Sequence, residues 1–246
     1  MSRYWLNAKA KAADPQAFAA QVSVICTLYA YARLLACLGV HVISCDEMTG
    51  IQALERVAAT QPMQPEQPER IEFEYVRHGT VSLIANFEVA SGQVVAPSLG
   101  PTRTEIDFAA HIAQTIATDP EAAWVFITDQ LNTHQSEALV RLVAQHCDPT
   151  VELGVKGKSG VLESQSSRAA FLSDAAHRIQ FVYVPKHTSW LNQVEIWFSI
   201  LVRRVIKRGN FRSQDDLREK ILAFIAYFNR MAKPFRWTYT GRPLQA

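Results

Sequence analysis

Three acidic residues of this 246-residue chain stand where carboxylates can do chemistry. Asp46 follows an apolar run at residues 41–45, and Asp129 follows another at residues 124–128. Such runs predict buried strands, and ligands of open α/β sheets gather at the carboxyl ends of the strands. Parallel, neighbouring strands would bring both carboxylates to one edge of the sheet. The third acid, Glu195, lies in the first turn of a predicted helix, on the polar flank of its apolar stripe.

Carboxylates that lie side by side repel each other and need a proton or a metal ion to coexist. Mg²⁺ suits them because it takes oxygen ligands and keeps positions open for water and phosphate oxygens. Three carboxylates with two divalent ions are suited to in-line displacement at phosphorus, where one ion activates a hydroxyl and the other stabilises the leaving oxygen. Asp46, Asp129 and Glu195 are therefore the candidate catalytic and metal-binding residues, with two Mg²⁺ or Mn²⁺ ions as cofactors. Each acid alone is also compatible with a turn or helix-cap residue, so the hypothesis depends on all three and on the order of the elements.

The order of elements follows from the spacing of apolar residues and from cap and turn signals. Strands are predicted at 41–46, 71–77, 81–90, 94–97, 124–128 and 179–184, with an antiparallel meander over 71–97 and a Pro-rich loop at 61–68. Helices are predicted at 15–38, after a capping box at 104–107, near 136–145, and from starts near Asn192 and at Ser213. This order predicts an α/β fold with one mixed sheet of about five strands flanked by helices.

Basic residues are concentrated at the C-terminal end of the chain. Residues 185–246 carry 12 Lys and Arg against four acids, a net charge of +8, which leaves −6 on the remainder. This asymmetry fits a polyanion such as DNA as partner, although a solvated helix face explains the charge equally well. The candidates for gripping DNA phosphates near the acids are Lys186, Arg203, Arg204, Lys207 and Arg208.

Three other classes of protein are not favoured. Residues 18–43 are apolar, but Arg33 divides them into parts too short to span a bilayer, so we expect a buried helix and no membrane association. The four cysteines form no C-x-x-C pair, which indicates reduced thiols and a cytoplasmic protein. Gly157-Lys-Ser159 is not a nucleotide-binding loop, because Glu152 stands where that motif needs glycine, and no nucleotide cofactor is expected.

Several residues close to the acids in sequence have two interpretations. Glu47 adjoins Asp46, but consecutive strand residues face opposite sides, so we expect only Asp46 to point into the site and keep Glu47 as the alternative ligand. Asn132, His134 and Asn192 could orient metal ligands or DNA phosphates. For Asn192 the favoured interpretation is a helix N-cap, and for His134 neither interpretation is favoured.

Two residues just before Glu195 complete the set. Trp190 could stack on a DNA base, but beside the apolar Leu191 it is expected in the core. His187 is expected in a surface loop rather than as a ligand.

Three stretches of the chain resemble a known family. They are Cys45-Asp-Glu-Met-Thr-Gly-Ile-Gln-Ala-Leu54, Thr128-Asp-Gln-Leu-Asn-Thr-His134 and Pro185-Lys-His-Thr-Ser-Trp-Leu-Asn-Gln-Val-Glu195. They are similar to the DDE transposases of bacterial insertion sequences, in the branch related to eukaryotic mariner elements. The resemblance extends from about residue 20 to 240. It implies a ribonuclease H-like fold, with Asp46, Asp129 and Glu195 as the metal-binding triad.

The resemblance also implies metal-dependent cleavage at transposon ends, attack of the freed 3′-hydroxyl on target DNA, and action as a homodimer on DNA. Members of the family usually begin with a helix-turn-helix region, for which the residues before Asp46 are too few. We therefore expect residues 1–40 to be a helical remnant or linker and residues 41–246 to be the catalytic domain. Asp129 and Glu195 are separated by 65 residues, more than in compact mariner relatives, which predicts an insertion near 150–178. We interpret this insertion as a DNA contact or a flexible loop. The alternatives are a nuclease of the same fold that does not join DNA and a non-transposing DNA-binding remnant.

Overall fold

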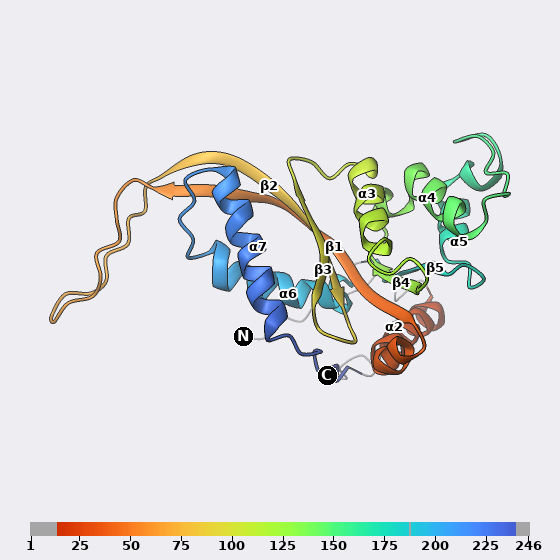
Figure 1. Cartoon of the computed structure of the whole chain (residues 1–246), viewed down its shortest axis with the longest axis horizontal. Helices are drawn as coiled ribbons and strands as arrows, with labels where there is room; N and C mark the ends of the chain where they lie inside the picture. Colours follow the sequence, from red (N-terminus) through yellow and green to blue (C-terminus); the bar gives the residue numbers. More distant parts are fainter. Residues whose placement is uncertain (1–13, 187, 240–246) are drawn as a thin grey trace.

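The computed structural model describes residues 14–186 and 188–239, and its centre is one five-stranded sheet in the order β3-β2-β1-β4-β5 (Figure 1). The strands are β1 (Val40–Arg56), β2 (Tyr75–Glu88), β3 (Val94–Gly100), β4 (Ala123–Thr128) and β5 (Ile179–Tyr183). β1, β2 and β3 pair antiparallel, whereas β1 pairs parallel with β4 and β4 parallel with β5. The predicted mixed five-stranded sheet is confirmed.

Helices cover both faces of this sheet, because alternate strand residues face opposite sides. The helices are α2 (Pro15–Cys37), α3 (Glu105–Ile116), α4 (Glu137–Cys147), α5 (Gln165–Leu172), α6 (Gln193–Leu201) and α7 (Gln214–Arg230), and a π-helix (Val202–Ile206) directly continues α6. On one face, Ile43 and Phe126 share a core with α3, α4 and α5. On the other face, Val42 and Ile127 share a core with α2, and Leu83 shares one with α6 and α7.

Only one side of α2 is buried, so the prediction of a buried helix is correct for that side alone. Val22, Ile25 and Tyr29 pack beneath the sheet at helical spacing, whereas the side chain of Tyr31 is 56% exposed. By length and composition α2 could cross a membrane, and 22% of its most apolar window is buried. A single such helix is weak evidence for a membrane protein, since core helices and signal sequences have the same length and composition. The division of the chain at residue 40 stays a prediction.

β2 runs without a turn from Tyr75 to Glu88 and joins parts of the strands predicted at 71–77 and 81–90, so the prediction of two strands is wrong. Between the pairs Gln52–Thr80 and Leu54–Arg77, β2 has one residue more than β1. This β-bulge includes Gly79, and β2 continues through it without a turn. Gly79 has a φ of +100° and faces the side chain of Gln214. A Cβ at this position would displace the end of the Gln214 side chain, and the positive φ would strain any residue other than glycine.

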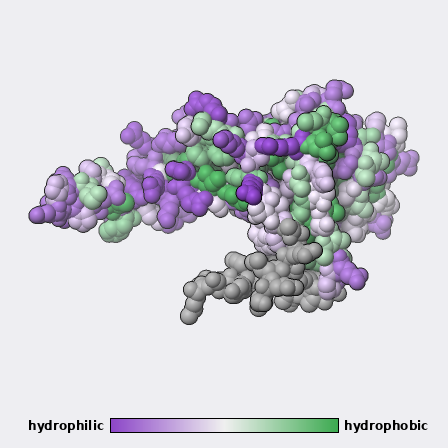
Figure 2. Space-filling model, turned by 90° about the horizontal axis from the view of Figure 1, so that it is seen from below, coloured by the Kyte–Doolittle hydropathy of each residue, from purple (hydrophilic) through white to green (hydrophobic). Residues whose placement is uncertain are grey.

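Residues 57–74 form an arm that extends from the ends of β1 and β2 away from the body (Figures 1 and 2). Its two limbs are joined by isolated bridges between Gln61 and Arg70 and between Gln64 and Gln67. The predicted Pro-rich loop is the tip of this arm. Outside its base the arm makes no buried core, and Met63 is 76% exposed.

The segment 150–178 is folded against the body, so its interpretation as a flexible loop is wrong. α5 begins with a capping box at Ser164, and Leu162 and Leu172 are fully buried beside α3 and α4. The buried Arg168 donates a hydrogen bond from Nε to the carbonyl oxygen of Gln135 at 2.6 Å. The contact of Arg168 holds the loop that follows β4 against α5. That the segment is an insertion relative to other family members stays a prediction.

Candidate active site

Asp46 lies at the point where β1 loses its parallel partner. β4 pairs with β1 only from Val40 to Ser44, whereas β2 pairs with β1 as far as Arg56. The prediction that the strand ends at Asp46 is therefore wrong, but the acid still marks the end of the parallel part of the sheet. Its side chain is 9% exposed, and its Oδ1 accepts a hydrogen bond from the backbone N–H of Glu47 at 2.8 Å.

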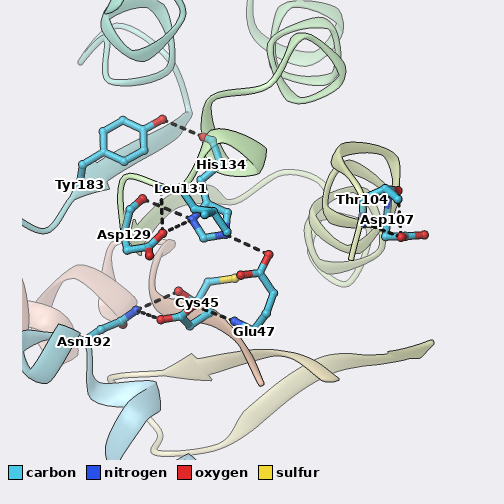
Figure 3. A network of polar contacts seen from close by, with 10 residues as sticks. Cys45, Glu47, Thr104, Asp107, Asp129, Leu131, His134, Tyr183 and Asn192 are labelled. Atoms are coloured by element: carbon cyan, nitrogen blue, oxygen red, sulfur yellow. Dashed lines mark hydrogen bonds and ion pairs between the residues drawn. The ribbon is translucent and has the colours of Figure 1, made fainter. Parts of the chain in front are cut away.

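Asp129 directly follows β4, as predicted, and two donors hold its Oδ1 atom. The backbone N–H of Leu131 donates to it at 2.9 Å, and Nδ1 of His134 lies 2.7 Å away (Figure 3). Partial burial disfavours ionisation of this carboxyl, but the hydrogen bond and charge of His134 outweigh that effect and lower the pKa of Asp129. Asp129 is therefore ionised and fixed at one oxygen, while its side chain remains 40% exposed.

His134 connects Asp129 to Glu47 through the two nitrogens of its ring (Figure 3). Its Nε2 lies 3.1 Å from Oε1 of Glu47, and both side chains are almost fully buried. Burial disfavours the imidazolium, but the two carboxylates outweigh it and raise the pKa of His134 well above its ordinary value. Glu47 therefore points away from Asp46 towards His134, as the alternation of strand residues predicts. The hydroxyl of Tyr183 fixes the backbone of the same turn by donating to the carbonyl oxygen of His134 at 3.0 Å.

Asn192 lies directly before α6, as predicted, but its side chain does not cap the helix. Its Nδ2 donates to the carbonyl oxygen of Cys45 at 2.9 Å (Figure 3). The same nitrogen lies 3.4 Å from Oδ2 of Asp46, to which it donates, and Oδ1 of Asn192 accepts from the hydroxyl of Ser44. Ser44 caps α6 instead, since its Oγ accepts from the backbone N–H of Val194 at 2.8 Å. Asn192 and Ser44 thus tie the start of α6 to β1 beside Asp46.

Glu195 occupies the first turn of α6 and is half-buried. Burial and the negative charge of Asp129 raise the pKa of Glu195. Among residues 14–186 and 188–239, no hydrogen bond or ion pair neutralises the Glu195 carboxylate. The helix N-terminus is its main stabilising influence.

The three acids therefore form one electrostatic site with Asp129 in the middle. Burial, reinforced by the charge of Asp129, raises the pKa of Asp46 to about 7. The described part of the chain holds no group of three His, Cys, Asp or Glu side chains close enough to bind an ion as they stand. The donors are nevertheless all carboxylate oxygens, and Asp46 is buried without a cation, which is the environment that suits a hard divalent ion such as Mg²⁺.

Residues 41–218 match the sequence profile of the family described as DDE superfamily endonuclease. The chain belongs to this family. The matched segment contains all three acids. No curated protein matches the sequence.

The fold of this DDE endonuclease is similar to that of solved mariner transposases. It matches the Mos1 mariner paired-end complex with Mn (10% identity, TM-score 0.51, 92% of this chain and 59% of that chain) and the Mos1 paired-end complex with the left transposon end (12%, 0.52, 92% and 58%). It also matches the catalytic domain of Mos1 mariner transposase (10%, 0.51, 92% and 85%). The chain thus spans 58–59% of the first two structures, and the predicted ribonuclease H-like fold is confirmed.

Other predicted site residues of the DDE endonuclease lie apart from the acids. Asn132 is exposed in a short 3-10 helix, and in the described ranges its side chain makes no hydrogen bond to an acid. Trp190 is 41% exposed, and its ring packs edge-on against that of Tyr239, with 4.9 Å between the ring centroids. The prediction that Trp190 belongs to the core is therefore wrong. The neighbouring Leu191 fills the core instead. His187 lies outside the described residues.

The predicted DNA-contacting residues are all exposed, and most lie on or beside the π-helix that continues α6. Lys186 stands alone before α6. Ile200, Arg203, Arg204 and Arg208 line a shallow hollow of about 400 Å³. Within residues 14–186 and 188–239 none of these cations forms an ion pair, so their charge is free for another partner. The role of Ser44 was not predicted from the sequence; the available signal is a serine two residues before an acid that follows an apolar run.

Proposed function

We propose that this chain is the catalytic domain of a DNA transposase that cleaves DNA at element ends and transfers the strand into target DNA. The observation that carries the proposal is the placement of the backbone around the three acids: Asp46 and Asp129 follow the paired parts of the parallel strands β1 and β4, and Ser44 of β1 holds the start of α6, which carries Glu195. Membership of the DDE endonuclease family supports it. The mariner relatives of similar fold are described as transposases with Mn, Mg or transposon ends, which supports a DNA substrate and divalent metal.

Asp46, Asp129 and Glu195 are the residues that would hold two Mg²⁺ or Mn²⁺ ions. Bound there, such ions supply activation of an attacking hydroxyl and stabilisation of the leaving oxygen. The protein's own part is positional. His134 and the Leu131 N–H hold one oxygen of Asp129, so the other stays available, and Asn192 holds Asp46 from the side of α6. Restricting both carboxylates before the substrate arrives lowers the entropic cost of assembling the site.

DNA would approach over the basic surface formed by Arg203, Arg204, Lys207 and Arg208, with Lys186 before α6. These side chains would contact phosphates and would not distinguish one DNA sequence from another. Binding should therefore weaken steeply with salt. Homodimer formation on DNA and a cytoplasmic location are further parts of the proposal.

The test is an incubation of the purified chain with supercoiled plasmid and Mg²⁺ or Mn²⁺. Wild-type protein and Asp215→Ala, which removes an acid that is 81% exposed on α7, should nick and join DNA equally. Asp129→Ala should do neither while still binding DNA. Equal activity of Asp129→Ala and wild type would refute the assignment of the triad.

The same assay separates the alternatives. Metal-dependent nicking without joined products identifies a nuclease of the same fold. Binding without any nicking identifies a DNA-binding remnant. Light scattering with and without DNA decides whether the chain dimerises.

A further inference from the structure

A hollow of about 450 Å³ lies along β1 just beyond the acids. β4 stops pairing with β1 at Ser44, so beyond Asp46 that edge of β1 has no strand partner among the described residues. The hollow begins at Met48, two residues after Asp46, and continues along the strand to Arg56. Its opposite wall is the end of the π-helix and the loop after it, including Ile206 and Phe211. The loop after the π-helix lies against this part of β1, since the backbone N–H of Phe211 donates to the carbonyl oxygen of Leu54 at 2.8 Å, and the hollow lies between that loop and the strand.

The side chains that line the hollow are aromatic, aliphatic and basic. Its charged residues are Arg56 and Lys207, and no acid lines it. Two aromatic rings stand at its rim where the arm joins the body: Phe73 is 82% exposed and Tyr75 is 43% exposed. Exposed rings beside cations are the combination that binds nucleic acid strands, because the rings stack on bases and the cations contact phosphates. Glu72 and Glu74 flank Phe73 in the arm but do not line the hollow.

The hollow also joins the basic surface of the π-helix. Lys207, in its wall, is the next residue after the π-helix that carries Arg203 and Arg204. π-Helical turns are rare and are frequent at functional sites. Here the turn places one cation at the hollow and two on the neighbouring surface, so that a phosphate backbone could run across all three.

We propose that this hollow binds an unpaired base of a DNA strand that runs from the candidate active site along β1, with Phe73 and Tyr75 stacking on the base and Lys207 contacting its phosphate. Its volume is in the range of about 300–1,000 Å³ that holds small ligands, so it has room for a single nucleotide. The proposal deepens the proposed function and rests on it for the identity of the ligand as DNA. Because Tyr75 pairs with Arg56 at the far end of β1, the site would hold a nucleotide at a distance from the cleavage point.

The experiment compares two short oligothymidylates of equal length, one complete and one whose central nucleotides lack bases. Both have the same phosphates, so any difference in affinity reports base stacking. Fluorescence anisotropy is measured with the full chain in EDTA, which prevents cleavage. Wild type should bind the complete strand roughly 5- to 100-fold more tightly than the strand without central bases. The double variant Phe73→Leu/Tyr75→Leu should lose this preference and bind the baseless strand as wild type does.

A matched control is Tyr31→Leu/Tyr227→Leu, which removes two exposed tyrosines, 56% and 58% exposed, from α2 and α7. It should keep the full preference for bases. Equal affinity of wild type for the two strands, or an undiminished preference in Phe73→Leu/Tyr75→Leu, would overturn the proposal. So would loss of self-association in that variant with base preference unchanged, because the hollow would then hold a segment of a second copy.

Failure of the two proposals can be told apart. Metal-dependent plasmid cleavage without any base preference leaves the proposed function standing and removes the nucleotide site. Base preference that depends on Phe73 and Tyr75, without metal-dependent cleavage in any variant, leaves the site standing and removes the catalytic function. Circular dichroism of the double variant confirms that loss of preference does not come from unfolding.

Discussion

Asp46→Asn should stabilise the metal-free protein, and the gain should grow with pH. Burial raises the pKa of Asp46 to about 7, above its ordinary value of 3.8. At low pH the carboxyl of Asp46 is neutral and its burial carries no charge penalty. The free energy of unfolding therefore falls as pH rises from about 4 to about 7. At 1.36 kcal/mol per pH unit, ionisation of Asp46 lowers the free energy of unfolding by roughly 4 kcal/mol at pH 8 and by about 1.5 kcal/mol at pH 5. Both are upper limits, because asparagine also loses hydration on burial.

The measurement is urea unfolding of wild type and Asp46→Asn at pH 5 and pH 8, in EDTA. The Oδ1 atom of asparagine can still accept the hydrogen bond from the backbone of Glu47, so the local structure should persist. Comparing the two proteins at one pH cancels the titration of other groups. A variant that is less stable than wild type at pH 8, or a gain that does not change between the two pH values, would refute the reasoning. Added Mg²⁺ should stabilise wild type and leave Asp46→Asn nearly unchanged.

Four other variants test the remaining contacts. Glu47→Ala leaves the buried His134 with one carboxylate, so urea unfolding should show a loss of about 3–5 kcal/mol, whereas Glu47→Gln should lose less. Ser44→Ala removes the acceptor for the first turn of α6 and should cost about 1–2 kcal/mol in the same assay; an unchanged midpoint contradicts the capping role. Arg203→Ala/Arg204→Ala should reduce the slope of log affinity for DNA against log salt by about 2, with a constant slope excluding phosphate contacts.

The positions of the acids could be predicted because local signals dominate there. Apolar runs fixed the core strands β1 and β4, and an acid directly after such a run falls at the carboxyl end of a parallel strand. Helix starts were equally readable, since the capping box at Thr104 and the cap at Ser213 are formed by neighbours in sequence. The excess of Lys and Arg in residues 185–246 likewise predicted exposed cations on and beside the helix that carries Glu195.

What could not be predicted depends on contacts between distant segments. Glu47 and His134 are 87 residues apart, and only the fold shows that the ring joins that acid to Asp129. Asn192 resembles an N-cap in sequence, but Ser44 takes that role from 150 residues away because β1 packs on the start of α6. Trp190 was misplaced because an apolar neighbour such as Leu191 does not show which of two consecutive residues faces inward.

The two aspartates at the sheet edge are held by opposite electrostatic means, and this has a consequence for stability. Asp129 has a cation built into the fold, since His134 lies between it and Glu47 and keeps both carboxylates paired. Within the described residues Asp46 forms no ion pair, and it accepts hydrogen bonds from the backbone of Glu47 and the side chain of Asn192. A second internal cation would stabilise the free protein, but it would occupy the oxygens and the charge that a divalent ion needs. The instability at Asp46 is therefore what one expects of a residue retained for binding rather than for folding.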